Sequence, residues 1–103
     1  MSTVDYDVIA AEVHRKAVRN LTNEMAIALR RTSGSPIVVE ANDFSTCLLD
    51  TNCEHLGFAA YVLFHLGTSL VGTRFVAEIA AQCDDVRPGD GWIVNDPHDG
   101  GAA

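Results

Sequence analysis

The chain has 103 residues, of which 48% are hydrophobic and 20% are charged, so it suits one packed domain or a piece of one and not a disordered tail. Fourteen acidic residues against seven basic ones give a net charge of −7, which disfavours nucleic-acid phosphates and anionic lipid as partners. The chain has three cysteines, Cys47, Cys53 and Cys83, and neither a signal peptide nor an apolar run long enough to cross a membrane. We therefore expect a cytoplasmic protein without a membrane segment, in which the thiols are buried.

The first predicted element is an amphipathic helix over residues 8–29. Its apolar residues recur at four-residue spacing and predict a stripe that faces the core, namely Ile9, Val13, Ala17, Leu21, Met25 and Leu29. Asp5 or Asp7 is expected to cap the start of this helix. Arg30 and Arg31 are expected to complement the partial negative charge of its end.

Two short strands are expected to follow the helix. Pro36 favours an extended conformation at Ser35, and the β-branched residues 37–39 predict the first strand. Residues 44–49 predict the second strand, and the pair is expected to form a hairpin. Residues 50–52 supply turn chemistry after it, because Asp and Asn side chains bond to nearby backbone groups.

The run from Leu56 to Leu66 is almost wholly apolar and too short to cross a hydrocarbon layer of ~30 Å as a helix, so it predicts buried protein. A second helix is expected over residues 69–82, with Thr68 as its cap. Residues 87–90 predict a turn, and residues 92–94 predict a strand after it. These elements predict a mixed α/β (α+β) fold.

Two places in the chain concentrate possible metal ligands. The glycine-rich loop at residues 95–101 contains Asp96, His98 and Asp99, a mixture of carboxylate and imidazole donors. Asp43 lies between the two predicted strands, where strand ends often present ligand groups. The same residues are also ordinary turn material, so the metal hypothesis and the structural one both stay open.

Other motifs assign no further chemistry. His55 and His65 border the apolar run and are interpreted as core histidines. The glycine-containing segment 67–73 lacks the lysine of a phosphate-binding loop, so ATP is not bound by a recognisable motif, and no catalytic residue is assigned.

No predicted element follows the polar loop before Ala103, which leads us to expect a portion of a larger domain.

Several short stretches occur in a specific order and spacing, namely residues 25–32, 35–36, 42–50, 65–69, 87–90, 94–97 and 100–101. Together they resemble the beginning of the hydantoinase B and oxoprolinase family, which includes subunits of acetone and acetophenone carboxylases. The resemblance covers nearly the whole chain. It implies that residues 1–103 are a single incomplete domain, the N-terminal portion of a hydantoinase B-like catalytic subunit.

The resemblance also implies a reaction and its cofactors. Family members hydrolyse a cyclic amide or carboxylate a ketone, while a hydantoinase A-like partner subunit uses ATP to phosphorylate the substrate oxygen. Asp43, Asp96 and His98 are then expected to line a cleft that holds a divalent metal (Zn, Mn or Fe). Family members often have an aromatic residue in place of His98. Two further ligands of the family follow the glycine pair and lie beyond Ala103, so the 103 residues alone are expected to be inactive.

Two other interpretations stay open. In the first, the chain is a non-catalytic protein-interaction module, and exposed apolar surface at residues 56–66 drives its association. In the second, it is a small metal-binding domain complete in itself. The second is disfavoured because Asp43, His98 and the cysteines lack a recognised ligand spacing.

Overall fold

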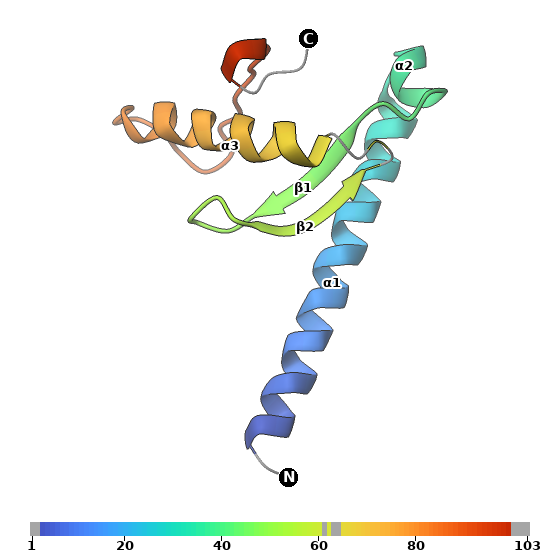
Figure 1. Ribbon diagram of the computed structural model, residues 1–103, viewed down its shortest axis with the longest axis vertical. Coiled ribbons are helices and arrows are strands. Elements are labelled where there is room, and N and C mark those ends of the chain that lie inside the picture. The colour runs from blue at the N-terminus through green and yellow to red at the C-terminus, as the bar shows by residue number, and fades with distance from the viewer. Residues whose placement is uncertain (1–2, 61, 63–64, 100–103) are drawn as a thin grey trace. The chain divides into compact units, whose positions relative to one another are not determined.

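A computed structural model describes residues 3–60, 62 and 65–99 (Figure 1). Its elements in chain order are α1 (Thr3–Thr32), α2 (Pro36–Val39), β1 (Ser45–Leu49), β2 (His55–Ala60), α3 (His65–Ala81) and the 3-10 helix η1 (Pro97–Asp99). The chain divides into two compact units, residues 1–63 and residues 64–103. The mixed α/β fold class predicted from the sequence is confirmed.

Helix α1 confirms the predicted N-terminal helix and extends beyond the predicted range at both ends. Because it begins at Thr3, Asp5 and Asp7 lie inside it, and the prediction that one of them caps it is wrong. Acidic residues near a helix N-terminus favour the helix through its dipole, which accounts for the extra N-terminal turn. Arg30 and Arg31 occupy the last turn, as predicted.

The face of α1 that packs against β1 and β2 is not the predicted stripe. Thr22 and Ala26 are 0% and 3% exposed, whereas Val13 and Leu21 are 60% and 48% exposed. With 3.6 residues per turn, each four-residue step moves about 40° around the helix. The predicted row over residues 9–29 therefore winds around α1, and the prediction that it faces the core as one stripe is wrong.

Helix α2 stands where β-branched residues predicted a strand, so that prediction is wrong. Ser35 is extended, with φ −87° and ψ 124°, and Pro36 follows in the first turn of the helix. At that position the missing proline N–H costs no hydrogen bond and its fixed φ suits the helix. The Val39 N–H donates to the Ser35 carbonyl oxygen at 2.9 Å, which closes the single turn.

Strand β1 confirms the predicted strand at residues 44–49, but its partner is β2 and not the preceding segment. The two strands are antiparallel, with Thr46 opposite Ala59 and Leu48 opposite Gly57, and the register is irregular between Leu48 and Leu49. The predicted hairpin between residues 37–39 and this strand is therefore wrong. Residues opposite one another share a face of the sheet, so these two pairs lie on one face.

The turn between β1 and β2 is the one that its residues predicted. Asp50 Oδ1 accepts hydrogen bonds from the N–H groups of Asn52 at 2.8 Å and Glu54 at 2.9 Å. The Cys53 N–H donates to the Asp50 carbonyl oxygen at 3.1 Å, and Cys53 has a φ of 62°. The Asp50 carboxylate thus organises the hairpin.

Helix α1 and the hairpin meet at Gly57, where β2 crosses the C-terminal half of α1 (Figure 1). A Cβ atom at Gly57 would lie 2.6 Å from Val18 Cγ1 and 3.0 Å from Thr22 Cγ2. On the neighbouring strand, Thr46 Oγ1 donates to the Thr22 carbonyl oxygen at 2.9 Å. Both strands are therefore anchored at the same turn of α1.

The apolar run at residues 56–66 is split between β2 and α3. Leu56 and Leu66 are 56% and 46% exposed, so the prediction of burial is wrong for these two side chains. Residues 61, 63 and 64 of the run lie outside the described residues. Among the helices that the structure describes, none is long and apolar enough to span a membrane.

Helix α3 confirms the predicted second helix, but it begins at His65. Thr68 consequently lies inside the first turn, where its Oγ1 donates to the His65 carbonyl oxygen at 3.1 Å. The prediction that Thr68 caps this helix is wrong. A side-chain bond back to a preceding carbonyl is a common alternative for threonine in a helix.

The turn at residues 87–90 is confirmed. The Asp90 N–H donates to the Arg87 carbonyl oxygen at 3.1 Å, and Gly89 has a φ of 96°. The strand predicted after it, at residues 92–94, is wrong, because the sheet in the described part of the chain contains only β1 and β2. Ile93 is 98% exposed, and a segment with no strand beside it cannot form a ladder.

We predict that Gly57→Ala lowers the free energy of unfolding by about 1–3 kcal/mol, because the added methyl group overpacks the contact with Val18. Urea denaturation measures the change. Gly34→Ala is the matched control, since nothing lies within 4 Å of a Cβ atom at Gly34. In a Val18→Ala background the cost of Gly57→Ala should shrink, and an equal cost in both backgrounds would contradict this origin.

Candidate functional site

Asp43 is exposed and lies in the first unit, between α2 and β1. Its N–H donates to the Ile37 carbonyl oxygen of α2 at 3.1 Å, and the N–H of Phe44 donates to the Asn42 carbonyl oxygen at 3.0 Å. Phe44 is only 7% exposed, so the chain is anchored directly after Asp43. Backbone bonds on one side and a buried ring on the other hold this carboxylate at the surface.

Asn42, directly before Asp43, is a polar group that the sequence interpretation did not single out. It has a φ of 54°, a left-handed conformation that asparagine tolerates better than most residues. Its Oδ1 is buried and accepts no hydrogen bond within the described residues. A buried acceptor of this kind costs free energy, and the Asn-Asp-Phe motif is the sequence signal that could have drawn attention to it.

Asp96 and His98 lie in the second unit, where the chain enters η1. The His98 N–H donates to Asp96 Oδ1 at 2.9 Å, a side-chain turn that brings the two residues together. Both are exposed. The predicted loop at residues 95–101 is thus partly helical, and Gly100 and Gly101 lie outside the described residues.

His98 also borders a shallow pocket of 360 Å³ against α3, whose remaining lining residues are Leu70, Val71, Arg74, Phe75 and Glu78. Arg74 and Glu78 stand four residues apart and therefore share one face of the helix. An imidazole, a guanidinium and a carboxylate thus surround an apolar floor. This group was not predicted from the sequence, although the four-residue spacing of Arg74 and Glu78 was a signal for it.

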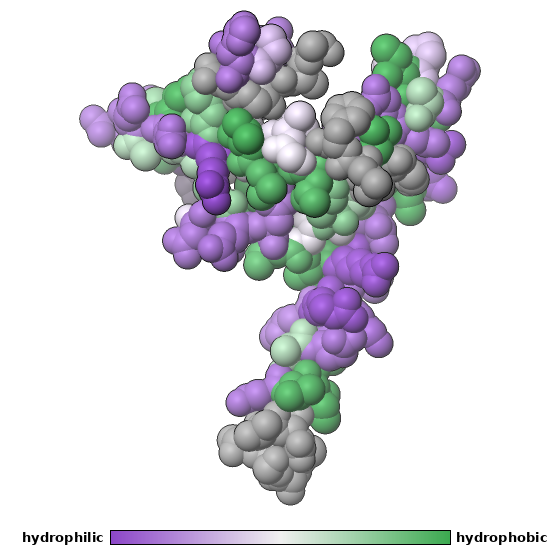
Figure 2. Space-filling view, in the orientation of Figure 1, coloured by the Kyte–Doolittle hydropathy of each residue, from purple (hydrophilic) through white to green (hydrophobic). Residues whose placement is uncertain are grey.

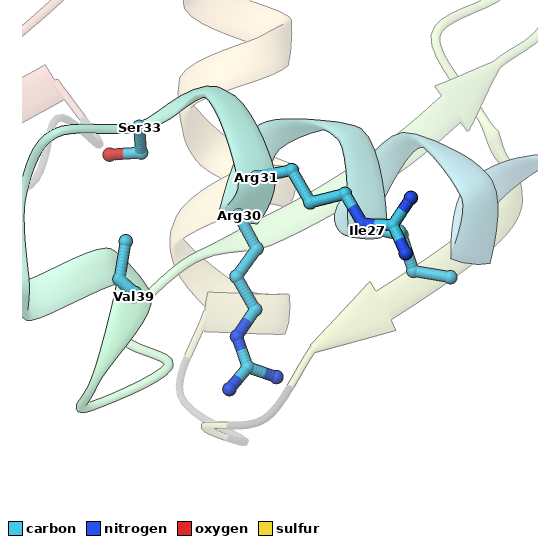
Figure 3. A pocket seen from close by; sticks show the side chains of 5 residues that line it. All are labelled: Ile27, Arg30, Arg31, Ser33 and Val39. Carbon is cyan, nitrogen blue, oxygen red and sulfur yellow. The ribbon is translucent and has the colours of Figure 1, made fainter.

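A second pocket, of 530 Å³, lies in the first unit at the end of α1 (Figure 3). Its lining residues are Ile27, Arg30, Arg31, Ser33 and Val39. Figure 3 shows the side chains of Arg30 and Arg31 pointing in different directions, so the two guanidinium groups do not form one clamp for an anion. Their position in the last turn of α1 is explained by the helix dipole.

The predicted metal ligands are therefore divided between the two units. Asp43 belongs to the first, and Asp96 and His98 belong to the second. Within residues 3–60, 62 and 65–99, no group of three or more His, Cys, Asp or Glu side chains is arranged to hold a metal ion. Two carboxylates and an imidazole nevertheless suit Zn, Mn or Fe chemically, so the donor set fits such a metal and the site stays a prediction.

His55, His65 and the three cysteines lie outside the predicted ligand set. His55 is half-buried, and its ring packs against that of Phe58 with the centroids 5.9 Å apart. His65 is half-buried at the start of α3. Cys47 and Cys53 are half-buried free thiols, whereas Cys83 is exposed, so the prediction of buried thiols is wrong for Cys83.

Comparisons with known proteins give one family match and several similar proteins. A family model described as hydantoinase B/oxoprolinase matches residues 7–102. The chain is 32% identical over 98 residues to 5-oxoprolinase of Saccharomyces cerevisiae, which covers 95% of this chain and 8% of that protein. It is 32% identical over 97 residues to caprolactamase subunit beta of Pseudomonas jessenii, which covers 94% of this chain and 16% of that subunit.

A third relative is an uncharacterised protein of Methanocaldococcus jannaschii, 31% identical over 93 residues, with 89% of this chain and 16% of that protein covered. The chain thus spans between 8% and 16% of the length of these three relatives. No solved structure gives a significant match.

We predict that Cys47 reacts slowly with thiol reagents at neutral pH. Burial raises the pKa of the Cys47 thiol. At neutral pH, which lies below that pKa, a smaller fraction of Cys47 is then the reactive thiolate. In a timed labelling experiment with iodoacetamide followed by peptide mass spectrometry, the exposed Cys83 should be labelled first. Labelling of Cys47 should accelerate as the pH is raised, and faster labelling of Cys47 than of Cys83 at pH 7 would contradict the prediction.

Proposed function

The chain belongs to the hydantoinase B/oxoprolinase family, and from this premise we propose that residues 1–103 are the N-terminal portion of a catalytic subunit that hydrolyses a cyclic amide. The observation that carries the proposal is the family match over residues 7–102. Two relatives are named for related substrates, since 5-oxoproline and caprolactam are both lactams. Ring opening of a lactam is the shared chemistry.

Within this proposal, Asp43, Asp96 and His98 would be ligands of a divalent metal. The turn around Asp43 supports the assignment, because its backbone is anchored by the bond to Ile37 and by buried Phe44. The Asp96–His98 turn supports it as well, since Asp96 Oδ1 fixes the backbone at His98. A divalent metal in such a site supplies polarisation of the amide oxygen or activation of water.

The energy for opening a stable amide comes, in this proposal, from ATP used by a hydantoinase A-like partner subunit. The word "subunit" in the name of the caprolactamase relative supports a multi-subunit enzyme. In this proposal the partner transfers the γ-phosphoryl group of ATP to the amide oxygen and releases ADP. The subunit to which this chain belongs then adds water in the cytoplasm, which opens the ring and releases inorganic phosphate. The role of this chain's residues is to bind and orient the activated group.

We predict that the complete subunit carrying this sequence, mixed with its ATP-using partner, opens 5-oxoproline or caprolactam in an ATP-dependent reaction. Asp43→Asn should lower kcat at least about 100-fold, because it removes a charged metal ligand. Product formation and ADP release are measured together.

The control for this prediction is Asp84→Asn, which neutralises an exposed aspartate of the second unit outside the proposed ligand set. It should leave kcat unchanged. Absence of ATP-dependent ring opening, or equal kcat values for the two variants, would rule out the proposed function of Asp43.

A further inference from the structure

The turn between α2 and β1 holds Asp43 at the centre of a tight bend. The Phe44 N–H donates to the Asn42 carbonyl oxygen at 3.0 Å, which closes a three-residue turn with Asp43 in the middle. The Asp43 N–H donates to the Ile37 carbonyl oxygen at 3.1 Å. Phe44 is only 7% exposed, so packing fixes the end of the turn. The backbone on both sides of Asp43 therefore sets the position of its carboxylate.

Asn42 has the unusual backbone conformation in this turn. Its φ is 54°, in the left-handed region that residues with a side chain seldom adopt. In the right-handed helical and extended regions φ is negative, so a change to either one rotates the chain by more than about 100° around the N–Cα bond of Asn42. Such a rotation separates the Asp43 N–H from the Ile37 carbonyl oxygen. The left-handed conformation at Asn42 is what the turn requires.

The side chain of Asn42 is not placed as a ligand. Its Oδ1 is buried, so it does not offer an oxygen to a metal ion beside the exposed Asp43. It also accepts no hydrogen bond within the described residues, and a buried acceptor without a donor disfavours folding. The left-handed backbone and the buried oxygen are two unfavourable features at one residue. Features of this kind persist where the surrounding structure holds them, and they cluster at functional sites.

Helix α2 supplies the fixed end of this arrangement. It is a single turn of four residues without a buried residue, and its Pro36 carbonyl oxygen accepts the Glu40 N–H at 2.8 Å. The next carbonyl oxygen, that of Ile37, accepts the Asp43 N–H. All of these bonds lie within residues 36–44, so they depend on no free surface, and further chain beside the turn only adds to its burial. Helix α2 and Asn42 together form a local support for Asp43.

We propose that Asn42 is a positioning residue, which holds the Asp43 carboxylate in place for metal binding through its own left-handed backbone. This inference rests on the proposed function, in which Asp43 is a metal ligand. Asn42 itself touches neither the metal nor the substrate. Glycine adopts a positive φ without steric cost, so it can replace Asn42 in this role. A β-branched residue cannot, because its side chain opposes that conformation.

Metal titration of the complete subunit, first freed of metal, tests the proposal with Zn²⁺, Mn²⁺ and, without oxygen, Fe²⁺. Asn42→Val should weaken binding of the preferred ion at least about tenfold, as is typical when a group that orients a metal ligand is changed. Asn42→Gly should retain the affinity of the unmodified subunit. Neither substitution changes the charge of the site. Unchanged affinity in Asn42→Val, or equal weakening in Asn42→Gly, overturns the proposal.

Cys53→Val is the matched control for this titration. Cys53 also has a positive φ, 62°, but it lies in the turn between β1 and β2. Valine is equally unfavourable there, so Cys53→Val should destabilise the fold as Asn42→Val does, while the metal affinity stays unchanged. A merely structural effect would act alike in the two valine variants, and equal loss of affinity in both overturns the proposal.

Amide hydrogen exchange of the metal-free subunit tests the backbone effect without a metal. Asn42→Val should speed the exchange of residues 43–44 at least about tenfold, because their backbone bonds open, and Cys53→Val should leave it unchanged. Unchanged exchange in Asn42→Val, with metal bound by the unmodified subunit, refutes the inference alone. If the unmodified subunit binds none of the three ions, the proposed metal site fails, and the role of Asn42 fails with it.

Discussion

The contact between Gly57 and α1 is the constraint on which the first unit depends. Gly57 has no side chain, so β2 approaches α1 closely enough that a Cβ atom there would lie 2.6 Å from Val18 Cγ1. At the same turn of the helix, Thr22 is fully buried and its carbonyl oxygen accepts a hydrogen bond from Thr46 of β1. One turn of α1 therefore determines where both strands lie, and β1 in turn begins directly after Phe44. The position of Asp43 follows from this packing.

Two short turns then present the proposed ligands, each by local backbone bonding. Asp43 follows the left-handed Asn42 and is tied to α2 through its own N–H, while Asp96 holds the backbone of His98 through a carboxylate oxygen. Asp43, Asp96 and His98 are all exposed, and the space-filling view shows apolar surface on part of α1 (Figure 2). The chain, which spans 8% to 16% of the length of its relatives, thus carries both exposed polar side chains suited to binding a metal and apolar surface suited to packing.

Local signals in the sequence predicted the elements that depend on local interactions. The two long helices, β1, the Asp50 turn and the turn at residues 87–90 are all confirmed. Two of the errors concern tertiary structure, because the partner of β1 and the buried face of α1 depend on the missing side chain of Gly57, which periodicity does not reveal. At α2 the position of Pro36 outweighed the β-propensity of the residues after it. Asp43 was singled out from its place in a motif, whereas Asn42 was not, because its buried oxygen becomes evident only in the folded chain.

The central claim is the proposal that Asp43, Asp96 and His98 are metal ligands in the assembled enzyme. Metal content by mass spectrometry, measured on the complete subunit that carries this sequence, tests it most directly, with Asp43→Ala compared against Asp84→Ala. The account predicts about one Zn, Mn or Fe ion per subunit in the unmodified protein and in Asp84→Ala, and loss of that ion in Asp43→Ala. A metal content that is the same in both variants, or the absence of metal from the unmodified subunit, would contradict it.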